Sequence, residues 1–270
     1  MMKRTPLRLA LGVAVSGLLL LTYVTSLSAE AATGSDAVWL PLNGSSGVAV
    51  KVNNAGSSVT VQRVVSEDGG SLTFASSYAT AGNALRYPAY DGDPAAPRAV
   101  VGVTNAGDTD GLTPRGRAFT IGADVRLARV NNGTPYDNGN NVIQRGLYDE
   151  ASQFKIQVDD GRASCRIKGL SGETMLTSGR AIATGAWYRL TCRRINRDGP
   201  DRFRLVVRPI ASDGSLGVAT KVSSTTTVGR LSFPVSTPMS LGGKLGNDLV
   251  IVAASDQFNG KLDNAFFRLD

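Results

Sequence analysis

Phe119-Thr120-Ile121-Gly122-Ala123-Asp124-Val125-Arg126-Leu127 places an apolar residue at every second position. A period of two is typical of a β-strand that buries one face and exposes the other. Residues 154–158 and 203–208 carry the same alternation. No stretch beyond the N-terminal segment keeps the 3.6-residue period of an amphipathic helix. The pattern therefore predicts an all-β chain.

Strand-like runs of this kind recur along most of the sequence, and turn-forming glycine is abundant at 31 residues. No linker separates the runs, so we expect one two-sheet antiparallel β-sandwich over residues 32–270. A pair of smaller sandwiches is the alternative. In the last run the apolar phase slips near Asp263, which predicts a β-bulge. The runs cover residues 38–42, 51–52, 59–65, 84–87, 99–103, 141–146, 154–158, 187–192, 203–208 and 261–269.

The N-terminus has the layout of a secretory signal peptide. A basic segment, residues 1–8, precedes an apolar run over Leu9–Leu21, and Ala29-Glu30-Ala31 supplies a small-x-small cleavage pattern. The apolar run is short for a membrane span of about 20 residues, so cleavage is favoured over an uncleaved anchor. We predict removal of residues 1–31 and a secreted, extracellular protein with no membrane attachment.

The absence of histidine excludes several classes of enzyme. Ser-His-Asp and Cys-His nucleophiles, histidine metal sites and histidine acid–base catalysis are all ruled out. Beyond the signal segment only three glutamates remain, and no two of them share a predicted strand: Glu67, Glu150 and Glu173. The adjacent pair Asp159-Asp160 is typical of a turn. The paired carboxylates of a glycosidase are therefore missing, and the sequence indicates a protein that is not an enzyme.

The net charge of +7 comes mainly from arginine, with a local cluster at Arg189, Arg193, Arg194 and Arg197. Such a cluster is compatible with a polyanion partner. Three of these arginines alternate with apolar residues, as on the solvated face of a strand. We therefore expect no nucleic-acid partner.

Only two cysteines are present, Cys165 and Cys192. Cys165 is in phase with Ile167 and Cys192 with Leu190, so both are expected to point into the core. A reactive dithiol wants a Cys-x-x-Cys spacing, which is absent. We predict a structural disulfide in an oxidising compartment, between neighbouring strands.

Four segments together resemble laminin G-like domains of the concanavalin A-like superfamily. Residues 119–127 resemble the strand "F-T-x-x-A/V-x-[ILV]-[RK]" of those domains, and Asn141–Gly146 resembles the strand that follows it. Gly185–Arg193 is similar to "G-x-W-[HY]-x-[LV]-x-[CV]", and Phe258–Ala265 to the closing strand "F-x-G-x-[IL]-D". The resemblance covers residues 119–269 and matches residues 32–118 only loosely.

That resemblance implies a jelly-roll sandwich. The superfamily includes glycan hydrolases, lectins and protein-binding modules, so the fold alone does not fix the function. The missing carboxylate pair favours a non-catalytic recognition domain that binds carbohydrate or another extracellular polymer. A hydrolase or lyase with atypical residues is one alternative, and a structural envelope protein without a small ligand is the other.

The segment Asn131–Asn141 is the candidate ligand site. Its aromatic ring suits stacking on a sugar, and its amide and carboxylate groups suit sugar hydroxyls. Asn, Asp and Gly are also what an ordinary turn requires. The residues expected to bind ligand are Tyr136, Asp137, Asn138 and Asn140.

A second candidate set consists of oxygen ligands for calcium. Carboxylate oxygens are preferred by Ca²⁺, and the resemblance implies a structural ion near the aspartate of the closing strand. The expected ligands are Asp91, Asp93 and Asp263. These residues are equally suited to form surface turns and to cap a bulge.

Overall fold

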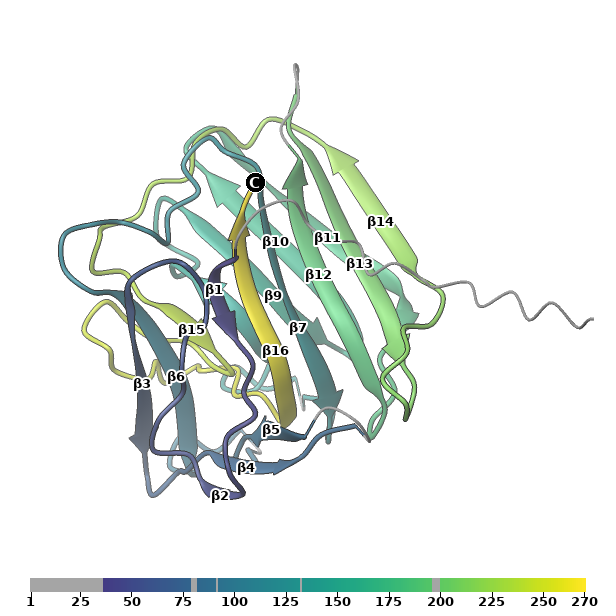
Figure 1. The fold of residues 1–270 in the computed structure, drawn as a ribbon. Helices are drawn as coiled ribbons and strands as arrows, with labels where there is room; N and C mark the ends of the chain where they lie inside the picture. Colours follow the sequence, from purple (N-terminus) through teal and green to yellow (C-terminus); the bar gives the residue numbers. More distant parts are fainter. Residues whose placement is uncertain (1–35, 79–81, 91, 132, 196–199) are drawn as a thin grey trace, which may run out of the picture. The chain divides into compact units, whose positions relative to one another are not determined.

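Two antiparallel β-sheets pack face to face in the computed structural model of the chain (Figure 1). The structure describes residues 36–78, 82–90, 92–131, 133–195 and 200–270. The described residues contain sixteen strands and no α-helix. The predicted signal peptide lies outside the described residues. Within the described part of the chain, no helix is long and apolar enough to cross a membrane.

Sheet A contains nine strands among the described residues and sheet B contains seven. Sheet A runs in the order β14-β13-β12-β7-β16-β5-β4-β2, and β1 also pairs with β16. Sheet B runs in the order β11-β10-β9-β8-β15-β6-β3. The strands are β1 (Asp36–Leu40), β2 (Gly47–Val48), β3 (Thr60–Glu67), β4 (Thr73–Ser76), β5 (Asn83–Arg86), β6 (Arg98–Asn105), β7 (Phe119–Leu127), β8 (Asn140–Arg145), β9 (Gln153–Asp159), β10 (Arg162–Gly169), β11 (Gly172–Ala181), β12 (Trp187–Ile195), β13 (Arg202–Ile210), β14 (Thr220–Thr225), β15 (Met239–Leu241) and β16 (Gly260–Leu269).

The core lies between the two sheets and is built from alternate residues of each strand. The apolar positions of β7, from Phe119 to Leu127, are all fully buried, as the period of two requires. Aromatic rings join the sheets at one point, where Phe154 of β9 stacks on Phe267 of β16 with ring centroids 5.6 Å apart. The predicted all-β, two-sheet sandwich is confirmed.

The segments that carried the family resemblance form β7, β8, β12 and β16. The expected bulge also exists. The register of β16 against β7 shifts after Asp263, and Asn264 adopts φ 48°. The expected strand at residues 51–52 is wrong, because these residues are loop and the nearby strand is β2. The sequence analysis missed β4, β11, β14 and β15.

Cys165 and Cys192 form the predicted disulfide, with Cα atoms 6.1 Å apart. The expectation of neighbouring strands is wrong, because Cys165 lies on β10 of sheet B and Cys192 on β12 of sheet A. Both side chains point into the core, as their alternation with apolar residues predicted. A sulfur atom in the core can reach the opposite sheet as easily as the next strand of its own sheet. The bond therefore ties the two layers together.

Removing this bond is expected to destabilise the sandwich without affecting its surface. The disulfide closes a loop with a sequence separation of 27, so Cys192→Ala should cost about 3 kcal/mol in the chain-entropy model. Thermal melting of the variant and the oxidised wild type measures the difference. Reduced wild-type protein is the control and should melt with the variant. Two titratable thiols in the native oxidised protein would contradict the assignment.

Candidate functional site

A pocket of about 650 Å³ lies at one end of sheet A. There β5 and β7 end and β16 begins (Figure 1). The segment after β5 forms one wall, and the residues just beyond β7 and before β16 form the other. Its lining residues are Arg86, Tyr87, Ala89, Tyr90, Ala96, Pro97, Arg126, Ala128, Arg129, Asn259, Gly260 and Lys261.

Three of the lining cations form a row across neighbouring strands. Lys261 of β16 is directly opposite Arg86 of β5 on one side and Arg126 of β7 on the other. The next residues along these strands, Leu85 and Val125, are fully buried in the core. Because side chains alternate between faces, the three cations share the outer face of sheet A. We call these three residues the cation row.

The cation row is electrostatically unfavourable in the absence of an anion. Burial, together with the charges of Arg126 and Arg86, lowers the pKa of Lys261. Its Nζ donates to the carbonyl oxygen of Ser76 at 2.6 Å, and Arg126 Nε donates to the carbonyl of Gly185 at 2.8 Å. Among the described residues, no carboxylate forms an ion pair with any member of the row. The pocket is therefore positively charged.

The candidate segment Asn131–Asn141 borders this pocket through two contacts. Asp137 is fully buried and pairs with Arg129, the fourth lining cation, at 3.3 Å. The hydroxyl of Tyr90 donates to the carbonyl oxygen of Tyr136 at 3.3 Å. The segment thus fixes parts of two pocket walls.

Asn140 holds a residue of the pocket wall through a buried hydrogen bond. Its side chain is fully buried, and its Oδ1 accepts a hydrogen bond from the backbone N–H of Asn259 at 2.8 Å. Asn259 in turn accepts the backbone N–H of Tyr90 on its own Oδ1 at 2.7 Å. One chain of hydrogen bonds therefore runs from the candidate segment to both sides of the pocket.

The structure divides the four expected ligand residues into two groups. Tyr136, with 41% of its surface exposed, and Asn138 are accessible from solvent. Asp137 and Asn140 are buried and bonded to protein groups. Ligand contact by any of the four residues stays a prediction. Sequence analysis missed the cation row, because its members are distant in the chain.

The expected calcium ligands are separately engaged. Asp91 lies outside the described residues. Asp93 Oδ1 accepts the backbone N–H of Ala95 at 2.8 Å in an exposed turn. Asp263 is buried on β16, where its Oδ2 accepts the hydroxyl of Ser77 at 2.6 Å. In the described ranges, no three carboxylates lie together in a group that would hold a metal ion. Calcium binding stays a prediction that melting with and without chelator would test.

A buried carboxylate pair lies farther along the same face of sheet A. Asp263 is directly opposite Asp124 of β7. The guanidinium of Arg189 donates twice to Asp124, at 2.6 and 2.7 Å, and Tyr78 and Asn264 complete its shell at 3.0 and 2.9 Å. Both carboxylates are inaccessible to solvent, so a substrate would have to displace this network to reach them.

Only one of the two carboxylates has an arginine partner. Burial, the largest cause, and the neighbouring Asp124 raise the pKa of Asp263 to about 7, and hydrogen bonds from Ser77 and Asn264 offset part of the rise. Burial and the charge of Asp124 also raise the pKa of Tyr78. Asp263 therefore holds a proton at mildly acidic pH.

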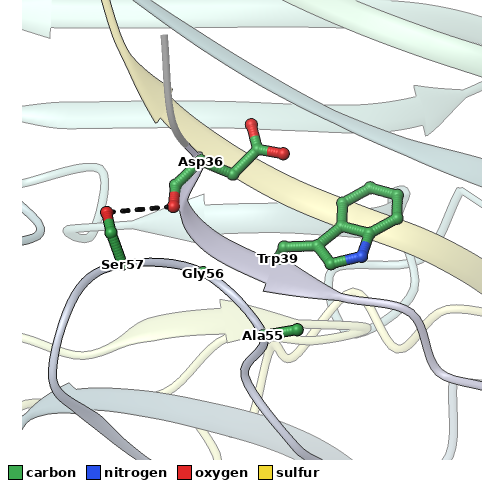
Figure 2. Close-up of a pocket in the computed structure, with 5 residues that line it drawn as sticks. All are labelled: Asp36, Trp39, Ala55, Gly56 and Ser57. Carbon is green, nitrogen blue, oxygen red and sulfur yellow. Dashed lines mark hydrogen bonds between the residues drawn. The ribbon is translucent and has the colours of Figure 1, made fainter.

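A second, smaller hollow of about 340 Å³ lies beside β1 (Figure 2). Its walls are Asp36, Trp39, Ala55, Gly56 and Ser57, with the Ser57 hydroxyl donating to the carbonyl of Asp36 at 3.2 Å. The carboxylate of Asp36 is already paired with Arg268 at 2.7 Å. One indole ring and no free charge make this hollow the weaker candidate.

No family model and no curated protein matches the chain. Several solved structures resemble it in fold. One is the LG1-3 region of the laminin α2 chain, at 14% identity and a TM-score of 0.41, covering 55% of this chain and 26% of that one. Another is the binding domain of Paraclostridial Mosquitocidal Protein 1, at 13% identity and a TM-score of 0.49, covering 87% and 47%.

A third similar structure is the enzymatically active domain of tailspike protein 2 from bacteriophage CBA120. It has 12% identity and a TM-score of 0.47 and covers 77% of this chain and 29% of that one. The chain therefore spans less than half the length of each of these three structures.

The raised pKa of Asp263 predicts a pH-dependent stability. The folded protein holds a proton that the unfolded chain releases above pH 4, so this contribution is complete below pH 4 and is lost as the pH rises through 7. Relative to Asp263→Asn, the wild type should lose about 2–3 kcal/mol of unfolding free energy between pH 5 and pH 8. Denaturant titrations at both pH values measure it.

The matched control is Asp108→Asn, which removes an exposed carboxylate of the β6–β7 connection. The unfolding free energy of Asp108→Asn should stay within about 0.5 kcal/mol of that of the wild type at both pH values, as for an ordinary surface substitution. Equal pH dependence in the wild type and Asp263→Asn would contradict the assignment.

Proposed function

We propose that this protein is a secreted, non-catalytic recognition domain that binds an extracellular carbohydrate or a related polymer in the pocket at the end of sheet A. The observation that carries the proposal is a pocket of about 650 Å³ that is bordered by the segment Asn131–Asn141, which also holds the partly exposed ring of Tyr136. Binding residues commonly gather on loops that a rigid scaffold positions. Secretion rests on the predicted signal peptide and agrees with the disulfide.

The segment that borders the pocket offers groups that sugar recognition needs. The phenol ring of Tyr136 presents an aromatic face for the C–H surface of a sugar. The exposed amide of Asn138 can donate to and accept from sugar hydroxyls. The hydrogen bonds through Asn140 and Tyr90 hold these walls before any ligand arrives, which lowers the entropic cost of binding.

The absence of suitable carboxylates supports the non-catalytic part of the proposal. Glu67 ends β3, Glu150 lies in the connection after β8, and Glu173 is on β11. Asp124 and Asp263 are close together, but both are buried and Asp124 is held by Arg189. A hydrolase needs a carboxylic acid and a carboxylate that flank the scissile bond.

Tyr136→Ala is the first test of the site. Loss of one stacked ring should weaken binding of any glycan found on an array by about two- to tenfold, corresponding to the roughly 0.5–1.5 kcal/mol typical of aromatic contacts. The melting temperature should change by less than about 2 °C, because the ring is partly exposed. Titration calorimetry with the array hit measures both affinities.

Tyr148→Ala is the matched control, since this tyrosine is 72% exposed and packs on Arg166 of sheet B. It should leave the affinity unchanged. If Tyr136→Ala binds every hit as tightly as the wild type does, the ligand site lies elsewhere.

The second test concerns catalysis. Incubation with β-glucans, xylans and galactans should release no reducing ends above the buffer blank, because the carboxylates of Asp124 and Asp263, which face each other across β7 and β16, are buried. Asp124→Asn is the informative variant. Release by the wild type that this variant abolishes would show the protein to be a hydrolase.

A further inference from the structure

We infer that the cation row, Arg86-Lys261-Arg126, is an anion-binding site, and that the ligand of this pocket is an acidic saccharide carrying carboxylate or sulfate groups. The inference rests on the proposed function and names the chemical class of its ligand. Three observations carry it: the register of the strands, the absence of acidic partners and the place of the row in the pocket.

The register places the three cationic residues side by side on neighbouring strands. Residues directly opposite on neighbouring strands lie about 5 Å apart, and Lys261 is opposite both Arg86 and Arg126. Like charges in this arrangement repel and destabilise a sheet. An anionic group placed over Lys261 would contact two cations at once and relieve their repulsion, which adds to the free energy of binding.

Other arginines on the same face of sheet A are arranged differently. Arg189 is opposite Arg208 and Arg193 is opposite Arg204, but each of these pairs includes a carboxylate partner. Arg189 binds Asp124 at 2.6 Å and Arg193 binds Asp270 at 3.1 Å. In the described part of the chain, the cation row has no such acidic neighbour, although three charges lie side by side.

The chemistry of the row fits carboxylate and sulfate. A guanidinium presents parallel N–H donors that match two oxygens of one anion, and an ammonium adds a compact point charge. Arg86 is exposed, while Arg126 and Lys261 are half-buried at the pocket floor. An anionic group can therefore enter from solvent and contact the exposed Arg86 together with Lys261 and Arg126, whose side chains are held by hydrogen bonds to backbone carbonyls.

The surroundings favour a saccharide over a nucleic acid. The cations line a single concave pocket of about 650 Å³ with Tyr136 at its border. A strand of nucleic acid is bound along a basic groove with several aromatic rings in succession. A compact site with one ring and amide groups suits one or two acidic sugar units.

Binding of the full mature chain to three probes tests the inference: oligogalacturonate, dextran sulfate and neutral dextran, at one fixed ionic strength. We expect at least one anionic probe to bind at least tenfold more tightly than neutral dextran. Lys261→Gln and Arg86→Gln should each weaken that binding by about tenfold. A preference for oligogalacturonate assigns carboxylate, and a preference for dextran sulfate assigns the sulfate ester.

Arg204→Gln is the matched control, because it removes the same charge from an exposed position on β13 of the same sheet. The affinity of Arg204→Gln for the anionic probes should stay within twofold of that of the wild type. Arg86→Gln guards against misfolding, since its exposed side chain can be replaced without opening the core. Its melting temperature should equal or exceed that of the wild type, because one repulsive charge is gone.

Three results would overturn the inference. The first is that neutral glycans bind and that their binding is abolished by Tyr136→Ala but not by Lys261→Gln. The proposed function would then stand, and the anion-binding site would be wrong. If Arg204→Gln weakens the anionic probes as much as Lys261→Gln, or if a DNA oligonucleotide binds as tightly, the effect is general surface charge. If no charged or neutral saccharide binds, the proposed function falls together with the inference.

Discussion

Burial of three apolar side chains fixes the arrangement on which the pocket depends. Leu85, Val125 and Leu262 belong to β5, β7 and β16, and all three are fully buried in the core. Because neighbouring residues of a strand face opposite sides, a slip of one residue in any of these strands would expose an apolar side chain. Because Arg86, Arg126 and Lys261 are next to these apolar residues in their strands, the same alternation places them on the outer face of sheet A. The hydrophobic effect thus holds together charges that repel each other.

The bulge in β16 has a comparable effect on the neighbouring polar network. One extra residue lets Asp263 and Asn264 both reach the outer side of sheet A, where Asn264 donates to Asp124. After the bulge the alternation resumes in the correct phase, so that Phe267 points inward and stacks on Phe154. The irregularity therefore serves two purposes. It supplies a hydrogen bond to a buried carboxylate and keeps the second half of the strand in register with the core.

Much of the fold follows from local patterns, but the pairing between distant strands does not. The alternation of residues 119–127 predicted β7 to the residue, and the phase slip located the bulge. Strands β11 and β14 were not predicted, because their sequences contain few large apolar residues and resemble those of loops. Inward phase predicted the disulfide but not the sheet of each partner. The cation row could not be predicted for the same reason. Its residues become neighbours only through the register between strands, and no single segment of sequence encodes that register.

The candidate segment shows why residue type alone does not separate ligand contact from internal hydrogen bonding. Amide and carboxylate groups suit sugars and buried hydrogen bonds equally, and local sequence does not distinguish the two uses. In the structure, Asp137 and Asn140 satisfy protein groups, while the carbonyl of Tyr136 is held by Tyr90 and its ring remains partly exposed. A fixed backbone with a free ring is the arrangement that a preorganised binding site requires. The buried polar residues thus fix the backbone beside the pocket, and the proposed function assigns ligand contact to the exposed residues.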